Sequence, residues 1–271
     1  MTRLGIAQVA LSALLLLAAQ PAAADRLDEV KARGRLVVGV SDTSPPFSFK
    51  RAGEGTAVGY SLDIMHAVAK RLGVVVDAVS LSASERVSQL RQGRIDVVAA
   101  SMTRTPERLD VIDFSYIYFV AAHAVIVRTS SGIRSVHELA GKRAVSTSTS
   151  TAADNLKEVV PTVDIVYARD YTAAFDMLKE GKVDAFPTDE SVLRALVQQD
   201  GHPGDYGFLS DFIKSRDVGL GLMKNEPRFK DAINKALLDV EASGDVARIF
   251  DVWFGPASPE PMPRKFKIQA D

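Results

Sequence analysis

Hydroxyl and guanidinium groups gather in one short stretch of the sequence, ASMTRTPER, which ends at Arg108. The apolar run before it, IDVVA, predicts a buried strand, and Thr105 with Pro106 predicts the capped start of a new helix. Thr103 then lies at the carboxyl end of a strand, where open α/β sheets bind ligands. Ser101, Thr103 and the forked guanidinium of Arg108 suit a small carboxylate. The alternative is an ordinary capped helix with a solvated arginine.

Motifs typical of enzymes are missing from the sequence. It has no G-x-S-x-G elbow, no P-loop and no H-E-x-x-H pair, and Gly53-x-Gly55 lacks the rest of a dinucleotide fingerprint. Asp189 and Glu190 are adjacent carboxylates, but neighbouring side chains in a strand or loop point apart, which disfavours an acid–base pair. We therefore expect no catalytic residues.

Metal ligands are also sparse. There is no cysteine, which excludes disulfides, a thiol nucleophile and lipid attachment through an N-terminal cysteine. We expect no metal or cofactor, and we expect each of the four scattered histidines to lie on a helix face or in a loop: His66, His123, His137 and His202.

Composition excludes polyanionic partners. The 33 basic and 34 acidic residues nearly cancel, so no net field favours nucleic acid or an anionic membrane surface. With 271 residues, 46% of them apolar, the chain can form one or two domains with sizeable cores.

The N-terminus has the pattern of a secretory signal peptide. MTR is followed by an apolar run and by Ala22-x-Ala24, the pattern of a signal peptide cleaved after Ala24. The alternative is a retained anchor, but the unbroken apolar core is short for the roughly 20 residues of a spanning helix. We therefore expect residues 1–24 to be removed and the rest to be exported to a periplasm.

The candidate ligand-binding residues need a scaffold that positions them. After residues 1–24, the sequence shows an alternating pattern of strands and helices. It predicts an α/β fold with mostly parallel strands. The first set comprises strands Arg35–Val40, Val74–Val79 and Ile95–Ala99 and helices Tyr60–Leu72 and Ser84–Gln92.

A second set follows the apolar stretch Tyr116–Arg128 and a capping box at Ser135–Glu138. A loop rich in Gly and Asp then leads to a last strand and helix, and four prolines predict an extended tail at Pro256–Pro263. The elements of this set are strands Ala144–Ser146, Val163–Tyr167, Val183–Phe186 and Val218–Met223 and helices Ala152–Val159, Tyr171–Glu180 and Pro227–Ser243.

Six segments, in order, resemble those of a known family, the periplasmic solute-binding proteins of ABC transporters for polar amino acids. They cover nearly all of the chain after the leader, and the branch that they resemble most is the glutamate/aspartate-binding one. The segments are GRLVVGVSDTSPPFSF, VGYSLDIMHAVAKRLG, LRQGRIDVVAASMTRTPERLDVIDFS, LAGKRAVSTSTSTAADNL, LKEGKVDAFPTDESV and IFDVWFG.

The resemblance implies a two-lobed, type II periplasmic binding-protein topology, in which each lobe is a mixed, mostly parallel sheet flanked by helices. The first lobe would comprise residues 25–119 and 219–271, and the second residues 120–218. Hinges would lie near Val120–Ala122 and Asp217–Val218. We expect a monomer that binds an amino acid between the lobes and docks on a membrane permease.

The resemblance also implies roles for single residues. In the family, the Ser-x-Thr-x-x-x-x-Arg element grips the ligand α-carboxylate, which here gives Ser101, Thr103 and Arg108. The aspartate of the family's D-A-x-x-T-D segment receives the α-ammonium, and Asp189 occupies that place in DAFPTD.

Other positions match less distinctive elements. Ser150 and Thr151 match a loop of the second lobe that supplies hydroxyls and N–H groups, the alternative being plain helix caps. Arg86 and Tyr171 resemble the residues that contact the side-chain carboxylate of an acidic ligand. Their alternatives are a solvated helix arginine and an aromatic residue at a helix start.

The loop after the first strand departs from the family pattern. Ser41 and Asp42 stand where the acidic-ligand branch has a basic residue, and Ser44 replaces the aromatic residue that stacks on ligands in other branches. An acidic amino acid is therefore favoured only modestly over other polar ones. Two other functions remain open, a dehydratase of the cyclohexadienyl type on the same fold and a ligand sensor for a membrane receptor.

Overall fold

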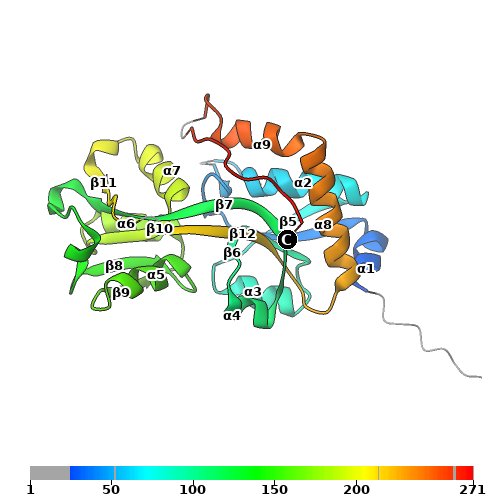
Figure 1. Ribbon diagram of the computed structural model, residues 1–271, viewed down its shortest axis with the longest axis horizontal. Coiled ribbons are helices and arrows are strands. Elements are labelled where there is room, and N and C mark those ends of the chain that lie inside the picture. The colour runs from blue at the N-terminus through cyan, green and yellow to red at the C-terminus, as the bar shows by residue number, and fades with distance from the viewer. Residues whose placement is uncertain (1–24, 52, 213, 259–260, 271) are drawn as a thin grey trace, which may run out of the picture.

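The computed structural model describes residues 25–271 except 52, 213, 259, 260 and 271, so the predicted signal peptide lies outside the described residues. Figure 1 shows two groups of elements, which we call lobe 1 and lobe 2. Lobe 1 contains helices α1 (Arg26–Arg33), α2 (Tyr60–Leu72), α3 (Glu85–Arg91), α4 (Pro106–Val111), α8 (Pro227–Ala242) and α9 (Asp245–Phe254) and strands β1 (Arg35–Val40), β5 (Val75–Ser80) and β6 (Val97–Thr103), with a small sheet of β2 (Thr43–Ser44), β3 (Ser48–Lys50) and β4 (Ala57–Val58).

Lobe 2 is built from the middle of the chain. Three short 3₁₀ helices, Thr129–Ser131, Val136–Leu139 and Pro203–Asp205, lie in its loops. Its main elements are strands β8 (Arg143–Thr147), β9 (Asp164–Ala168), β10 (Ala185–Asp189) and β11 (Tyr206–Phe208) and helices α5 (Thr151–Val159), α6 (Tyr171–Lys179) and α7 (Glu190–Asp200).

Two long antiparallel strands, β7 (Asp113–Arg128) and β12 (Lys214–Leu222), run from one lobe to the other (Figure 1). Asp217 pairs with Val120, and Ser215 pairs with Ala122, so the two predicted hinge segments lie side by side. The register between these strands shifts on both sides of Gly219, and such irregularities bend and twist a strand pair.

The strands form one sheet in the order β5-β1-β6-β12-β7-β10-β8-β9, with β11 paired to β7. Pairing is parallel within β5-β1-β6 and within β10-β8-β9, and antiparallel wherever β7 or β12 takes part. The predicted two-lobed α/β architecture with two crossing segments is confirmed. The division at residues 119 and 218 stays a prediction.

Helix α2 shows how the sequence determines where a helix of lobe 1 begins, packs and ends. Ile64, Met65 and Val68 are fully buried on one face, and Gly73 ends the helix in the left-handed conformation, with φ 74°. Gly59, which precedes the helix, has φ 143°, and a Cβ there would lie 2.2 Å from the carbonyl oxygen of Phe47. Only glycine fits this entry into the helix.

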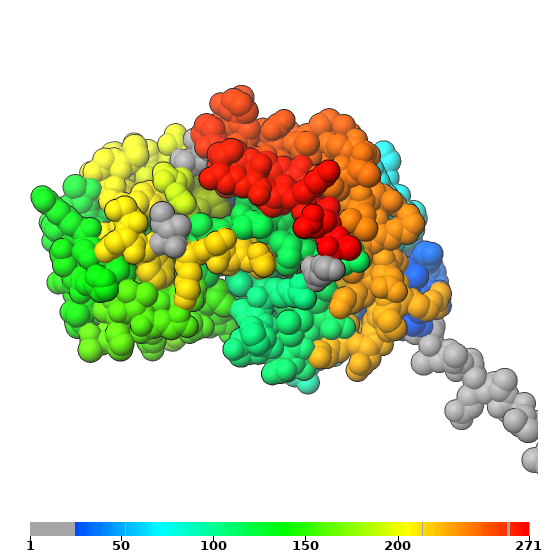
Figure 2. Space-filling model, viewed as in Figure 1, coloured from blue at the N-terminus to red at the C-terminus, as the bar shows by residue number. Residues whose placement is uncertain are grey.

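The end of the chain returns to the crossing strands. The described residues of the predicted extended segment form no helix or strand, and beyond them Phe266 packs 5.1 Å from the ring of Phe119 on β7. Ile268 is buried in the same core. Figure 2 shows this segment lying across the face of the molecule, next to β7 and α9.

Helix α7 has no counterpart among the predicted elements, although Val192, Leu193, Leu196 and Val197 form a buried stripe with helical spacing. Strand β12 begins at Lys214, four residues earlier than predicted, because its polar first half pairs with β7. Among the described residues, no helix is long and apolar enough to cross a membrane.

Candidate ligand-binding site

A cleft lies beside the crossing of β7 and β12, and the fold brings all eight predicted ligand-binding residues to its wall. Lobe 1 supplies Arg86, Ser101, Thr103 and Arg108, and lobe 2 supplies Ser150, Thr151, Tyr171 and Asp189. An adjoining cavity shares Arg86 and Tyr171 and extends to Ser41 and Asp42. The roles of these residues toward a ligand stay predictions.

Arg108 lies across the mouth of this cleft. Its Nη1 donates to the carbonyl oxygen of Thr103 and its Nη2 to that of Thr149, each over 2.8 Å, so it touches both lobes. Burial, with the guanidinium groups of Arg86 and Arg216 nearby, lowers the pKa of Arg108 to about 10. The side chain is still a cation at neutral pH, and an anion beside it would relieve the repulsion.

Ser150 and Thr151 open helix α5 on the opposite wall. The Ser150 hydroxyl accepts a hydrogen bond from the N–H of Ala153, as in an ordinary N-cap. The Thr151 hydroxyl lies 3.1 Å from that of Thr103, across the cleft. Capping and contact with the cleft therefore occur together at this helix start.

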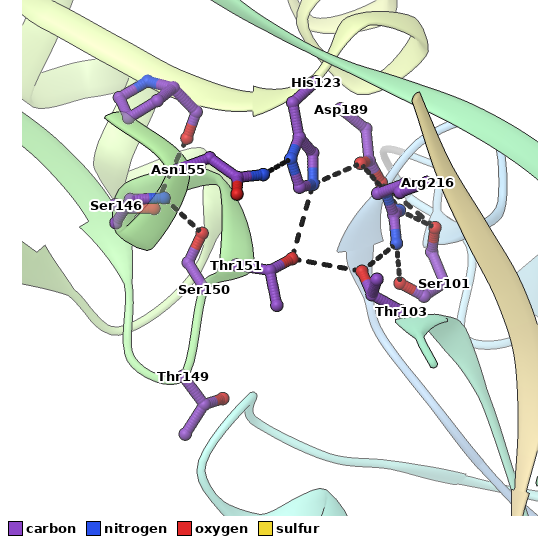
Figure 3. Close-up of polar contacts among 12 residues, drawn as sticks. Ser101, Thr103, His123, Ser146, Thr149, Ser150, Thr151, Asn155, Asp189 and Arg216 are labelled. Atoms are coloured by element: carbon purple, nitrogen blue, oxygen red, sulfur yellow. Dashed lines mark hydrogen bonds and ion pairs between the residues drawn. The ribbon is translucent and has the colours of Figure 1, made fainter. Parts of the chain in front are cut away.

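Asp189 forms an ion pair with an arginine that sequence reasoning missed. Arg216, on β12, donates from Nε to Asp189 Oδ1 over 2.6 Å and from Nη2 to Oδ2 (Figure 3). Ser101 also donates to Oδ2, over 3.0 Å. Asp189 and Arg216 are 3% and 7% exposed, so this is a buried, bidentate pair.

His123, on β7, completes the polar cluster, so the prediction that it lies on a helix face or in a loop is wrong. Asn155 Nδ2 lies 2.8 Å from His123 Nδ1, and an amide nitrogen can only donate there. His123 Nε2 therefore carries the proton and faces Thr151 at 3.4 Å and Asp189 at 3.7 Å (Figure 3). Burial lowers the pKa of His123 to about 4, so the ring is neutral at pH 7.

Arg86 and Tyr171 lie deeper, where the two cavities meet. Arg86 is 8% exposed; its Nη1 donates to Ala100 O over 3.1 Å, and its Nε has no hydrogen-bond partner among the described residues. Tyr171 is half-buried at the start of α6, with its ring 6.5 Å from that of Phe186. The buried guanidinium fits the predicted ligand contact better than a solvated helix residue.

Asp42, the acidic residue that departs from the family pattern, is already paired. Its carboxylate accepts from Lys50 over 2.8 Å and from the hydroxyl of Ser80. Ser41 accepts from the N–H of Thr43 within the same loop. The pairing with Lys50 offsets the charge of Asp42, which lines one cavity with Arg86.

Within the described part of the chain, no group of three or more His, Cys, Asp or Glu residues could hold a metal ion. Glu190, next to Asp189 in the sequence, points to the surface and accepts from Arg194 instead. The buried carboxylate of the cleft, Asp189, is thus paired with Arg216 and not with Glu190.

Residues 36–256 match the bacterial extracellular solute-binding proteins, family 3. The chain belongs to this family. It is 31% identical over 212 residues to a glutamine-binding protein of Geobacillus stearothermophilus, covering 77% of this chain and 80% of the relative. It is also 28% identical over 250 residues to an L-glutamate/L-aspartate-binding protein of Pseudomonas aeruginosa, covering 88% and 82%.

A solved structure of an ancestral arginine-binding protein bound to glutamine is 35% identical, with a TM-score of 0.78 over 82% of this chain and 99% of that one. The fold of this family 3 protein is therefore the type II periplasmic binding-protein fold that the resemblance implied. These relatives are solute-binding proteins, in agreement with the expectation that the chain is not an enzyme.

Proposed function

We propose that this family 3 protein is the periplasmic binding component of an ABC importer and that it binds a free amino acid or a close relative between its lobes. The observation that carries this proposal is Arg108, a partly desolvated cation that touches both lobes beside a row of hydroxyl groups. Such a guanidinium suits the α-carboxylate of the ligand.

Closure of the lobes follows from this arrangement. A carboxylate at Arg108 would face the hydroxyls of Thr103 and Thr151, which come from opposite lobes. Because the ligand gains both sets of contacts only in the closed state, binding favours closure about the crossing of β7 and β12. A membrane permease would then take up the solute from the closed protein, which we expect to act as a monomer.

The side-chain end of the ligand would lie toward Arg86 and Tyr171. The buried Arg86 guanidinium, which forms no ion pair among the described residues, supports an acidic ligand such as glutamate or aspartate. The pairing of Asp42 with Lys50 supports the same choice, since it removes a nearby repulsive charge.

The test is a thermal-shift and calorimetric screen of the refolded chain, residues 25–271, against the common amino acids. Refolding matters because a solute carried through purification would mask binding. Stabilisation by a carboxylate-bearing solute, lost in Arg108→Gln, supports the proposal; no stabilisation by any amino acid or organic acid contradicts it. Uptake of the bound solute by cells with and without the cognate permease separates transport from sensing.

A further inference from the structure

We infer that Arg216 fills the cation position opposite Asp189, so that the cleft binds dicarboxylates without an α-amino group at least as tightly as the corresponding amino acids. This inference rests on the proposed function for the carboxylate contact at Arg108. It goes further in one respect. The resemblance assigns the ligand ammonium to Asp189, whereas we infer that a cation of the protein, Arg216, occupies that position.

Asp189 has little acceptor capacity to spare, because its charge is already matched by Arg216. A carboxylate offers about four lone-pair directions. Arg216 Nε donates to Oδ1 over 2.6 Å, and Arg216 Nη2 and the Ser101 hydroxyl donate to Oδ2, so three of these directions are filled. His123 Nε2 lies 3.7 Å from Oδ1, too far for a hydrogen bond but on its remaining side. A ligand ammonium would therefore compete with Arg216 for a carboxylate whose charge is already neutralised.

The hydrogen bonds of Arg216 are saturated, so the guanidinium lines the cleft without a free N–H for a ligand. Besides its two bonds to Asp189, it donates from Nη1 to Ser101 O over 3.2 Å and to Thr103 Oγ1 over 2.5 Å, and from Nη2 to Ser101 Oγ over 2.8 Å. All five guanidinium N–H groups therefore have partners. The pair is neutral as a unit, and it fixes the Ser101 and Thr103 hydroxyls.

Two cations remain after this pair is set aside. Arg86 and Arg108 donate only to backbone carbonyls and form no ion pair in the part of the chain that the structure describes. His123 is neutral, as described above. The wall of the cleft thus presents two guanidinium groups without an ion pair among the described residues, Arg86 buried and Arg108 partly buried.

The other carboxylates that line the two cavities do not change this balance. Asp42 contacts Lys50, and Asp170 contacts Arg169 and caps α6. Glu107 and Asp154 are exposed and act on Arg108 only through a Coulombic attraction that water screens, without an ion pair. A ligand ammonium in the cleft would therefore lose its hydration without gaining a buried anion, which is costly.

A dianion meets these conditions directly. One carboxylate would lie at Arg108 and the other at Arg86, so the ligand charge of minus two matches the two unpaired guanidinium groups. A 2-oxo, 2-hydroxy or unsubstituted dicarboxylic acid of four or five carbons has this charge. An acidic amino acid of the same length has a net charge of only minus one.

The decisive experiment is calorimetric titration of the refolded protein with glutamate, 2-oxoglutarate and glutarate, and with aspartate, oxaloacetate and succinate. We expect the best acid without an amine to bind as tightly as its amino acid or up to 100-fold more tightly. Amino acids that bind more than 10-fold more tightly than both of their counterparts would overturn the inference and leave the proposed function standing. Absence of binding by all six acids and by the other amino acids would overturn both.

Arg216→Gln provides an independent readout, because it frees Asp189 to accept an ammonium. We expect the affinity ratio of glutamate to 2-oxoglutarate to rise at least 10-fold in this variant, and an unchanged ratio would contradict the inference. The matched control is Arg228→Gln, which also removes an arginine from an aspartate pair, with Asp25 and Asp28, but at the exposed surface of lobe 1. If Arg216→Gln does not fold, the wild-type titration decides alone.

Discussion

The hydroxyl oxygens of Thr103 and Thr151 lie 3.1 Å apart, one at the end of β6 in lobe 1 and the other at the start of α5 in lobe 2. Arg108 adds a second link between the lobes through Thr149 O, and Ser101 adds a third through Asp189. The contact between the lobes is thus held in part by the protein's own groups, and two of the predictions below remove one member of this set.

Arg108→Gln should abolish ligand binding without unfolding the protein. The variant loses charge-assisted hydrogen bonds of about 1.5–3 kcal/mol each, so we expect affinity to fall roughly 100-fold or more. Because Arg108 is only partly buried and its protein partners are carbonyls, the free energy of unfolding should change by about 1 kcal/mol or less. Calorimetry and urea unfolding check the two effects; Arg134→Gln, an exposed site of lobe 2, is the control. If Arg108→Gln bound the ligand with wild-type affinity, Arg108 would not be the residue that contacts the ligand carboxylate.

Asp189→Asn should destabilise the folded protein strongly. It leaves the buried Arg216 guanidinium without its counter-ion, a change that typically costs about 3–5 kcal/mol. Asp28→Asn, which breaks an exposed pair with Arg228, should cost far less, because water screens that pair. Urea unfolding of both variants measures the difference. The double variant Asp189→Asn/Arg216→Met should recover much of the lost stability. Equal losses in Asp189→Asn and Asp28→Asn would contradict a buried pair.

His123 should make the protein more stable as pH rises from about 4 to about 6.5. The unfolded histidine titrates near its ordinary pKa of roughly 6.5, whereas burial lowers the folded pKa to about 4, so the unfolded chain binds more protons in this window. Asp189, Arg216, Lys214 and Arg108 are the charged groups that act on the ring.

The expected slope from His123 is up to about 1.4 kcal/mol per pH unit. Unfolding measured from pH 4 to 7 should lose this component in His123→Gln and keep it in His202→Gln, where the side chain is exposed. The same pH profile in His123→Gln and in the wild type would show that the ring does not titrate in this range on unfolding.

Arg86→Met should reduce affinity for dicarboxylates while leaving monocarboxylate ligands unaffected. Loss of one charge-assisted contact predicts a roughly 10- to 100-fold decrease. The unfolding free energy should fall by no more than about 1.5 kcal/mol, since Arg86 Nε is buried without a partner and methionine fills a similar volume. Arg91→Met, exposed on the same helix, is the control. An equal loss of affinity for both ligand classes would mean that Arg86 supports the shape of the cleft wall and does not contact the second carboxylate.

Gly59→Ala should destabilise lobe 1 by roughly 3 kcal/mol or more, because the added Cβ meets the Phe47 carbonyl at 2.2 Å and φ is 143°. Gly55→Ala is the matched control, since nothing lies within 4 Å of its Cβ position. Thermal and urea unfolding compare the two variants. A small effect at Gly59 would mean that the entry to α2 can shift without cost.

The sequence was most informative where local patterns and tertiary structure agree. The spacing of Ile64, Met65 and Val68, with Gly73 as a stop, predicted the bounds of α2 as they are found. Ser101 and Thr103 were located because they directly follow the strand predicted at Ile95–Ala99. The observed strand, β6, extends through both residues to Thr103, and its carboxyl end lines the cleft.

Arg216 and His123 could not be found in this way. The run KSRD at residues 214–217 has the composition of a loop, and it is a strand only because β7 extends far enough to pair with it. His123 lies in an apolar strand, where a single polar residue carries no signal of its partners. The ion pair, the histidine tautomer and the charge of the cleft all depend on contacts between segments far apart in the chain.

The position of β12 also determines which lobe can complete its sheet first while the chain is synthesised from its N-terminus. All seven residues of β6 are buried, and β6 lies between β1 and β12. Strands β8 to β11 of lobe 2 all precede residue 214, so lobe 2 has its own strands before lobe 1 receives its last one. Until residues 214–222 arrive, β6 is an apolar open edge, the kind of surface on which chains aggregate. A delay in synthesis or export just before β12 therefore endangers the lobe that began to form first.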